Sequence, residues 1–520
     1  MKVLKKLLAL LVVIFLITLI SLWLLTELVK PEFIRSYLNS YFSGLTHQNS
    51  EVEGNISWQI FPRPGIKATK IRIGDEKKPS YYSAKLENLL FNLKITPLLS
   101  GKLVFNELKV DGFIINVHNQ SPEFLISNPS KSKVTHESKS NLTEHFAIES
   151  FLLSHGRIHV NENNQTISLT GLQIGGEQFN LYRQIFPFQL KTDFKIENDK
   201  QILLKGQLNF KGSTSLSPLL FSNPFLTLKN TPLDGVVSLQ HVKFKQFRIA
   251  ELSAHTITRP GVILFNPLTL NLYNGESLGD LSYEFGSQKL TLNQTATNLD
   301  SSKFIKDLLN KSLFKGTLDL SIHAQTNLQN ANWLNNTSGN GSFTIKNGMV
   351  ESINLVKVIE DLSSKINQLF NGQTVKKEPY LDLLQFNNSE FFKGGTDFKL
   401  LTFQYQLKDA NLVSNSLILQ TDYLQLKGEG SLNLNNERID AKVLAKIKDL
   451  NSGIGKVQQL IGGSFPIQLS GTLTEPNLTP DLQKINPILA QIWLKTTLTH
   501  PVETLGKTLK LILENGQQLL

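Results

Sequence analysis

Few residues in this sequence have the types and spacing that a catalytic or metal site needs. His155 and His159 share the i, i+4 spacing that places two metal ligands on one face of a helix. Their segment, Gly156-Arg157-Ile158-His159-Val160, is instead typical of a strand, in which four residues span about 13 Å. The two imidazoles therefore cannot share a metal ion within that strand, and we interpret them as side chains of a solvated strand.

Two glycine-rich segments also lack what their chemistry would require. Gly462-Gly463-Ser464-Phe465 misses the second glycine of a nucleophile elbow, and Gly339-Asn340-Gly341-Ser342 misses the lysine and the strand–helix context of a phosphate loop. The absence of cysteine excludes disulfides, thiolate metal sites and a cysteine nucleophile. We therefore predict a protein that is not an enzyme and has no catalytic residues, metal or cofactor; an undetected hydrolase is the catalytic alternative.

The elements that must position any site are predicted to be strands. In Leu401-Thr402-Phe403-Gln404-Tyr405-Gln406-Leu407 every odd position is apolar or aromatic and every even one is polar, which is typical of a strand with one dry face. The same alternation recurs at 439–447, 70–73 and 207–211. It predicts a mainly β fold, a long antiparallel meander whose turns include Lys346-Asn347-Gly348 and Asn435-Asn436.

Three stretches depart from the alternation. Apolar residues at helical spacing that end before Gly372 predict one inserted helix, and these are Ile353, Val356, Ile359, Leu362, Ile366 and Leu369. Apolar-periodic runs after Pro487 and Pro501 predict amphipathic C-terminal helices, which either cap a sheet edge or touch a membrane. Residues 121–141 are rich in Ser, Lys, Asn and Pro and are predicted to form a mobile loop.

The first 25 residues indicate the cellular compartment in which the protein lies. Leu7–Leu25 is an uncharged apolar run that spans about 28 Å as a helix, close to the thickness of a hydrocarbon core. Lys2, Lys5 and Lys6 precede it, so the N-terminus is expected in the cytoplasm and the body outside it. A cleaved signal peptide is the alternative, but the run is long for one and no small-residue cleavage site follows it.

The charge balance does not indicate a nucleic-acid partner. The formal net charge is +10 and the pI is about 9.3. Lys and Arg are scattered along the chain, whereas nucleic-acid binding favours a basic stripe with interleaved aromatic residues or a recognisable motif. Weak attraction to anionic lipid surfaces is the expected consequence of this charge.

Segments at both ends of the sequence resemble the AsmA family of bacterial envelope proteins. The N-terminal similarity lies in residues 31–35, in the strand entry at residues 54–66 with its Gly54, Trp58 and Phe61-Pro62, and in residues 97–103 and 108–112. The C-terminal similarity lies in residues 339–348, 353–355, 396–398, 428–432 and 466–481. Residues from about 177 to 300 are similar to the family only in strand character.

This resemblance implies a repeating β-groove, an elongated and curved antiparallel sheet related to chorein-like, bridge-type lipid-transfer proteins. It implies a single-pass protein of the cell inner membrane, with its body in the periplasm, that holds phospholipid acyl chains and supports lipid transport to, and assembly of, the outer membrane. Its expected partners are phospholipids, the inner membrane and other envelope or outer-membrane assembly proteins. The candidate groove-lining residues are Leu401, Phe403, Tyr405, Leu407, Ile439 and Val443.

The same observations leave alternatives open. Two sheets packed as ordinary sandwiches explain the alternation equally well. A structural or assembly factor that binds outer-membrane proteins through sheet edges, without carrying lipid, is the alternative function. The expected regions are a cytoplasmic tail (1–6), a transmembrane anchor (7–25), an N-terminal AsmA/chorein-like β region (26–176), a middle β-groove region (177–338), a C-terminal AsmA-like β region (339–481) and C-terminal helices (482–520).

Overall fold

The computed structural model describes most of the chain between residues 31 and 487. The described residues are 31–46, 48–59, 64–74, 82–94, 105–118, 147–162, 165–199, 201–217, 230–244, 246–329, 332–351, 353–370, 389–481, 483–485 and 487. They form two compact units, Met1–Leu270 (unit 1) and Asn271–Leu520 (unit 2). The predicted anchor at 7–25, the loop at 121–141 and the helices after Pro487 lie outside the described residues.

The prediction of a mainly β protein is confirmed, because the described residues form 22 strands. Unit 1 begins with helix α2 (Pro31–Thr46). Its strands are β1 (Ser50–Val52), β2 (Ile56–Gln59), β3 (Gly65–Ile73), β4 (Tyr82–Leu93), β5 (Phe105–His118), β6 (Ala147–Glu162), β7 (Gln165–Asn180), β8 (Phe186–Asn198), β9 (Gln201–Thr214), β10 (Leu233–Phe244) and β11 (Phe247–Arg259). Strand β12 (Val262–Leu272) contains the boundary between the units.

The strands of unit 1 pair with their neighbours in sequence, and almost all pairs are antiparallel. Strands β1 and β2 both pair with β3, and each strand from β3 to β10 pairs with the next. The prediction of an antiparallel meander is wrong at one place, since β5 and β6 are parallel. Parallel neighbours need a connection of a dozen or more residues, and the long segment 119–146 between these strands meets that need.

Helix α2 covers the free edge of β1 in unit 1. Arg35 donates to the carbonyls of Val52 and Gly54, and the Asn39 side chain accepts the Val52 N–H at 2.9 Å. One turn further along, Ser43 Oγ accepts the Ser50 N–H at 3.0 Å. Arg35, Asn39 and Ser43, which follow one another at four-residue spacing on one face of α2, thus make hydrogen bonds to β1 that a neighbouring strand would otherwise make. This blocks edge-to-edge pairing at β1.

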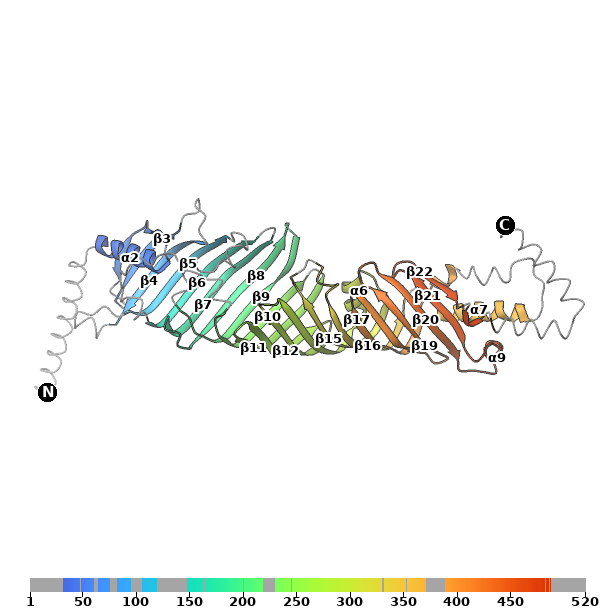
Figure 1. Ribbon diagram of the computed structural model, residues 1–520. Helices are drawn as coiled ribbons and strands as arrows, with labels where there is room; N and C mark the ends of the chain where they lie inside the picture. Colours follow the sequence, from blue (N-terminus) through green and yellow to red (C-terminus); the bar gives the residue numbers. More distant parts are fainter. Residues whose placement is uncertain are drawn as a thin grey trace, which may run out of the picture. The chain divides into compact units, whose positions relative to one another are not determined.

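The described residues of unit 2 form ten strands and three α-helices. Its strands are β13 (Gly275–Glu284), β14 (Lys289–Asp300), β15 (Phe314–Asn327), β16 (Ser338–Val350), β17 (Thr396–Lys408), β18 (Asn411–Gln420), β19 (Leu424–Asn433), β20 (Arg438–Ile447), β21 (Phe465–Gly471) and β22 (Pro476–Pro480). Its helices are α6 (Ser301–Leu309), α7 (Leu355–Phe370) and α9 (Gly453–Leu460), with a 3₁₀ turn at η3 (Ser389–Phe392) (Figure 1).

The strands of unit 2 form one sheet instead of two facing ones. Each strand from β13 to β21 pairs antiparallel with the next. Helices α6, α7 and α9 follow β14, β16 and β20. Because alternate strands of a meander end on the same side, all three helices lie at one end of the strands, which we call the helix end; the opposite side is the hairpin end.

Residues in left-handed conformation bend the strands of unit 2. Asn298, Gly316 and Asn347 have φ of 59°, 135° and 48° in the adjacent strands β14, β15 and β16. The strand register shifts beside Asn298 and at Gly316, as it does at β-bulges, which increase twist and bend a sheet. The predicted turn at Lys346-Asn347-Gly348 is therefore wrong: these residues lie inside β16. The turn predicted at Asn435-Asn436 is confirmed between β19 and β20.

Candidate functional site

The six candidate residues lie in unit 2, on strands β17 and β20, and share one face of the sheet. Strand register pairs Leu407 with Leu412, Leu412 with Leu432, and Leu432 with Ile439. A second row runs from Phe403 through Leu417 and Gly428 to Val443. Directly opposed residues point to the same side of a sheet. Leu401 and Tyr405 alternate in phase with Phe403, so the six belong to one surface, the apolar face of unit 2.

The row nearest the helix end of this face is sealed by protein. It consists of Ile345, Leu401, Leu419, Leu426, Ala445 and Phe465, each at most 5% exposed. These side chains form one core with Val358, Ile359, Leu362 and Ile366 of α7. Leu401 therefore contacts fixed side chains of the protein, and it is the one candidate that the structure buries.

The remaining candidates are only half-buried. Phe403 stacks on Phe343 with ring centroids 5.0 Å apart and ring planes inclined by 22°. Tyr405, Leu407, Ile439 and Val443 keep similar partial exposure. Protein atoms thus cover only part of this apolar and aromatic surface, and the uncovered part can contact another apolar molecule.

Tyr405 is set flat against the sheet by a glycine. Gly341 lies opposite it on β16, and a Cβ there would come within 2.5 Å of the Tyr405 hydroxyl. The phenol reaches across Gly341 and donates to the Ser321 carbonyl of β15 at 3.4 Å. Burial raises the pKa of Tyr405, so its hydroxyl stays a neutral donor at physiological pH.

One ion pair shows that the sheet of unit 2 curls around its apolar face. Lys311 follows α6 at the helix end, whereas Glu437 lies in the β19–β20 turn at the hairpin end. Their Nζ and Oε2 atoms are 3.7 Å apart. Because strands about ten residues long span roughly 33 Å, opposite ends of these non-adjacent strands can meet only if the sheet curls. Since α6 contributes the buried Ile305 to the same core as the sealed row, the apolar face lies inside this curl.

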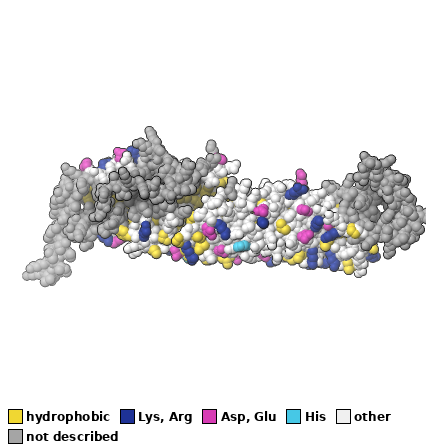
Figure 2. Space-filling model, viewed as in Figure 1, with side chains coloured by type: hydrophobic (Ala, Val, Ile, Leu, Met, Phe, Trp, Pro, Cys, Tyr) yellow, Lys and Arg dark blue, Asp and Glu magenta, His cyan; other side chains and the backbone are white. Residues whose placement is uncertain are grey.

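The opposite face of unit 2 carries paired charges beside exposed apolar side chains such as Val413 and Leu444. Lys346 and Asp319 form a cross-strand ion pair at 2.7 Å. Desolvation by itself would raise the pKa of Asp319. Two hydrogen bonds, from Lys346 and from the Asn298 N–H, together with the positive charge of Lys346, have the larger effect and lower this pKa. Figure 2 shows cationic, anionic and hydrophobic side chains interspersed over the visible face.

The two histidines considered for metal binding lie in β6, which confirms the predicted strand. His155 Nδ1 lies 2.6 Å from Asp111 and His159 Nδ1 lies 3.3 Å from Ser168, so the two rings have different partners. Hydrogen bonds from His155 and Ser154 lower the pKa of Asp111. Within the part of the chain that the structure describes, no three His, Cys, Asp or Glu side chains gather as metal ligands.

Several residues of the apolar face were not predicted from the sequence. They are Phe343, Leu412, Leu417 and Leu432. Alternation in Ser342-Phe343-Thr344-Ile345 was a sufficient signal for Phe343. Helices α6 and α9 were also missed, although each has a cap: Asp300 accepts the Lys303 N–H at 3.2 Å and Ser452 accepts the Gly455 N–H at 3.0 Å.

Comparison with known proteins gives one match. The model of the AsmA family matches residues 1–217 and 191–417. The match includes the middle region, where the sequence resembled the family only in strand character, and it stops before the similar segments at 428–432 and 466–481. No curated protein and no solved structure matches the chain. Among the described helices, none combines the length and apolar character of a membrane span.

Proposed function

Since the chain belongs to the AsmA family, we propose that the apolar face of unit 2 holds the acyl chains of phospholipids, and that the protein supports lipid transport to, and assembly of, the outer membrane. The supporting observation is the partial burial of a continuous apolar surface on the inside of a curled sheet. Each CH₂ group moved from water onto such a surface contributes about 0.8 kcal/mol. Acyl chains supply many such groups and need no specific hydrogen bonds.

Bound lipid tests this proposal directly. The full-length protein, purified in a detergent and exchanged into a lipid-free amphipathic polymer, should retain phospholipid at one or more molecules per chain, measured by quantitative mass spectrometry of the extract. Leu401→Val serves as a control, because Leu401 contacts protein in the sealed row. This variant should retain the same amount of phospholipid as the wild type. A wild-type protein free of phospholipid would contradict the proposal and favour an assembly factor that carries no lipid.

We also propose that residues 7–25 anchor the protein in the inner membrane with its body in the periplasm. A reporter enzyme that is active only outside the cytoplasm should therefore be active when fused after Leu520. Replacing Lys2, Lys5 and Lys6 by Glu should reduce that activity, because the positive residues set the orientation of the span. Activity of a cytoplasm-specific reporter at the same fusion point would contradict this topology.

A further inference from the structure

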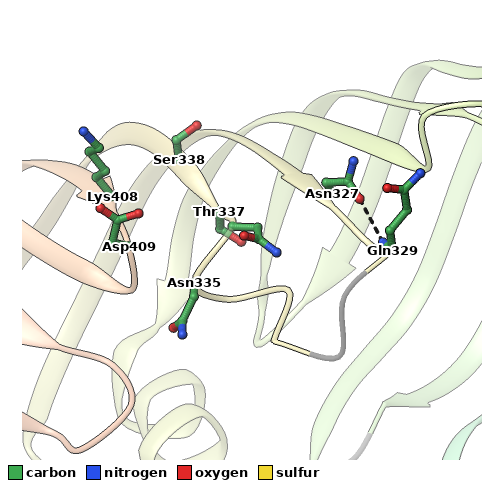
Figure 3. Close-up of a pocket in the computed structure, with 8 residues that line it drawn as sticks. Asn327, Gln329, Asn335, Thr337, Ser338, Lys408 and Asp409 are labelled. Atoms are coloured by element: carbon green, nitrogen blue, oxygen red, sulfur yellow. Dashed lines mark hydrogen bonds between the residues drawn. The ribbon is translucent and has the colours of Figure 1, made fainter.

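A polar pocket of about 390 Å³ lies at the hairpin end of unit 2. Amide, hydroxyl and charged side chains line it, and none of the lining side chains is apolar. The lining residues are Asn327, Gln329, Asn335, Asn336, Thr337, Ser338, Lys408 and Asp409. Figure 3 shows Asn327 and Gln329 on one side of the pocket and Lys408 and Asp409 on the other. We call it the rim pocket.

Internal hydrogen bonds hold the shape of the rim pocket. The Asn327 side chain accepts the Gln329 N–H at 2.9 Å (Figure 3), and Asn335 accepts from Asn435 in the β19–β20 turn at 2.8 Å. Thr337 donates to the Trp333 carbonyl at 2.8 Å. These bonds hold the described residues of the β15–β16 connection and link them to the β19–β20 turn, so part of the lining is organised before any ligand binds.

Four lining side chains have no such internal role. Those of Gln329, Asn336, Lys408 and Asp409 make no hydrogen bond or ion pair with other described residues. They place two amides, one ammonium and one carboxylate around the pocket. One charge of each sign suits a ligand that also carries both, whereas a purely anionic group would face the Asp409 carboxylate.

The rim pocket lies beside the last row of the apolar face. Gly339 pairs with Leu407 in that row, and the next pair outward is Ser338 with Lys408. Since successive residues alternate between faces, Ser338 and Lys408 turn away from the apolar face and the pocket lies over the rim of the sheet. An amphiphile with its chains along the Leu407 row would therefore turn its polar group over this rim, past Gly339, which has no side chain, to reach the pocket on the other face.

We propose that the rim pocket binds the zwitterionic phosphoethanolamine head group of a phospholipid. The ammonium of Lys408 pairs with the phosphate, and the carboxylate of Asp409 pairs with the amine. The amides of Gln329 and Asn336 complete the hydrogen bonding of the phosphate oxygens. This site rests on the proposed function, because the acyl chains of the same lipid lie on the apolar face of unit 2.

A competition between two lipids tests the head-group site. Full-length protein is incubated with vesicles of equal parts phosphatidylethanolamine and phosphatidylglycerol, re-isolated, and its bound lipids are quantified by mass spectrometry. The wild type should be enriched about fivefold in phosphatidylethanolamine, which corresponds to about 1 kcal/mol. The double variant Lys408→Gln/Asp409→Asn should lose the enrichment and keep the total amount of lipid. Asn tolerates the left-handed conformation of residue 409, whose φ is 51°, so the turn is preserved.

The matched control is a Lys–Asp ion pair near the other end of β17. The variant Lys399→Gln/Asp422→Asn removes the same charges from exposed positions and should keep the wild-type enrichment. Bound lipid in the ratio of the vesicles, or enrichment that survives in the Lys408→Gln/Asp409→Asn variant, would overturn the head-group site alone. A wild type that acquires no lipid would overturn the proposed function together with it.

Discussion

Phe403→Glu is expected to leave unit 2 folded while lowering its bound phospholipid about tenfold. Phe403 is half-buried and stacks on Phe343, so the substitution removes an aromatic contact of about 1 kcal/mol without emptying a sealed core. A carboxylate at a partly exposed site keeps its hydration, and an acyl chain that covered it would have to remove that water at a cost of several kcal/mol. A loss of about 1.4 kcal/mol in lipid binding already gives the tenfold decrease.

The neighbouring residue provides the control for this substitution. Gln404 lies on the opposite face and is exposed, so Gln404→Glu adds the same charge one residue away without reaching the apolar face. It should match the wild type in lipid content and in thermal unfolding midpoint. If Phe403→Glu folds and binds a normal amount of lipid, Phe403 does not contact the acyl chains; if it aggregates or is degraded, the face is a sealed core at this strand.

Leu362→Asp is expected to have the largest effect on stability. Leu362 of α7 is 0% exposed and packs in the core that seals the helix end of the apolar face. The substitution removes a buried side chain, which alone costs about 2–5 kcal/mol, and leaves a carboxylate with no partner in that core. A total above about 4 kcal/mol is a large part of the stability of a domain. Unit 2 should therefore unfold or be digested rapidly by protease.

Ser364→Asp is the matched control for the helix. Ser364 lies two residues further along α7 and is exposed, so the change adds the same carboxylate to the same helix without entering the core. Its unfolding midpoint should lie within about 2 °C of the wild type, as is usual for a surface substitution. An equal loss of stability in both variants would mean that charge on α7, and not burial of Leu362, determines the result.

The secondary structure that local patterns specify could be predicted from the sequence. Alternation at 401–407 and 439–447 predicted parts of β17 and β20, and the spacing from Ile353 to Leu369 predicted α7. Of the six residues that define that spacing, Ile359, Leu362 and Ile366 are fully buried in the core. These predictions succeeded because each depends on which side chains must leave water within one element.

Features that depend on distant pairing could not be predicted. Alternation does not distinguish one curled sheet from two packed sheets, and the bend of unit 2 depends on left-handed residues such as Asn347, which resembles a turn residue in the sequence. The burial of Leu401 and the partial exposure of Phe403 also differ although both have the same phase in β17. Leu401 is buried because α7 packs on it, and that packing joins residues that are far apart in the sequence, so no local pattern indicates it.

The most direct test of acyl-chain binding compares two adjacent positions of the protein in intact cells. A photo-reactive phenylalanine analogue is placed at residue 403 or at residue 404 of the full-length chain, the cells are irradiated, and adducts are identified by mass spectrometry. Position 403 should form phospholipid adducts on the acyl chains, and position 404, on the opposite face, should form few or none. An absence of phospholipid adducts at 403, or equal labelling at both positions, would contradict the proposal that the apolar face of unit 2 holds lipid.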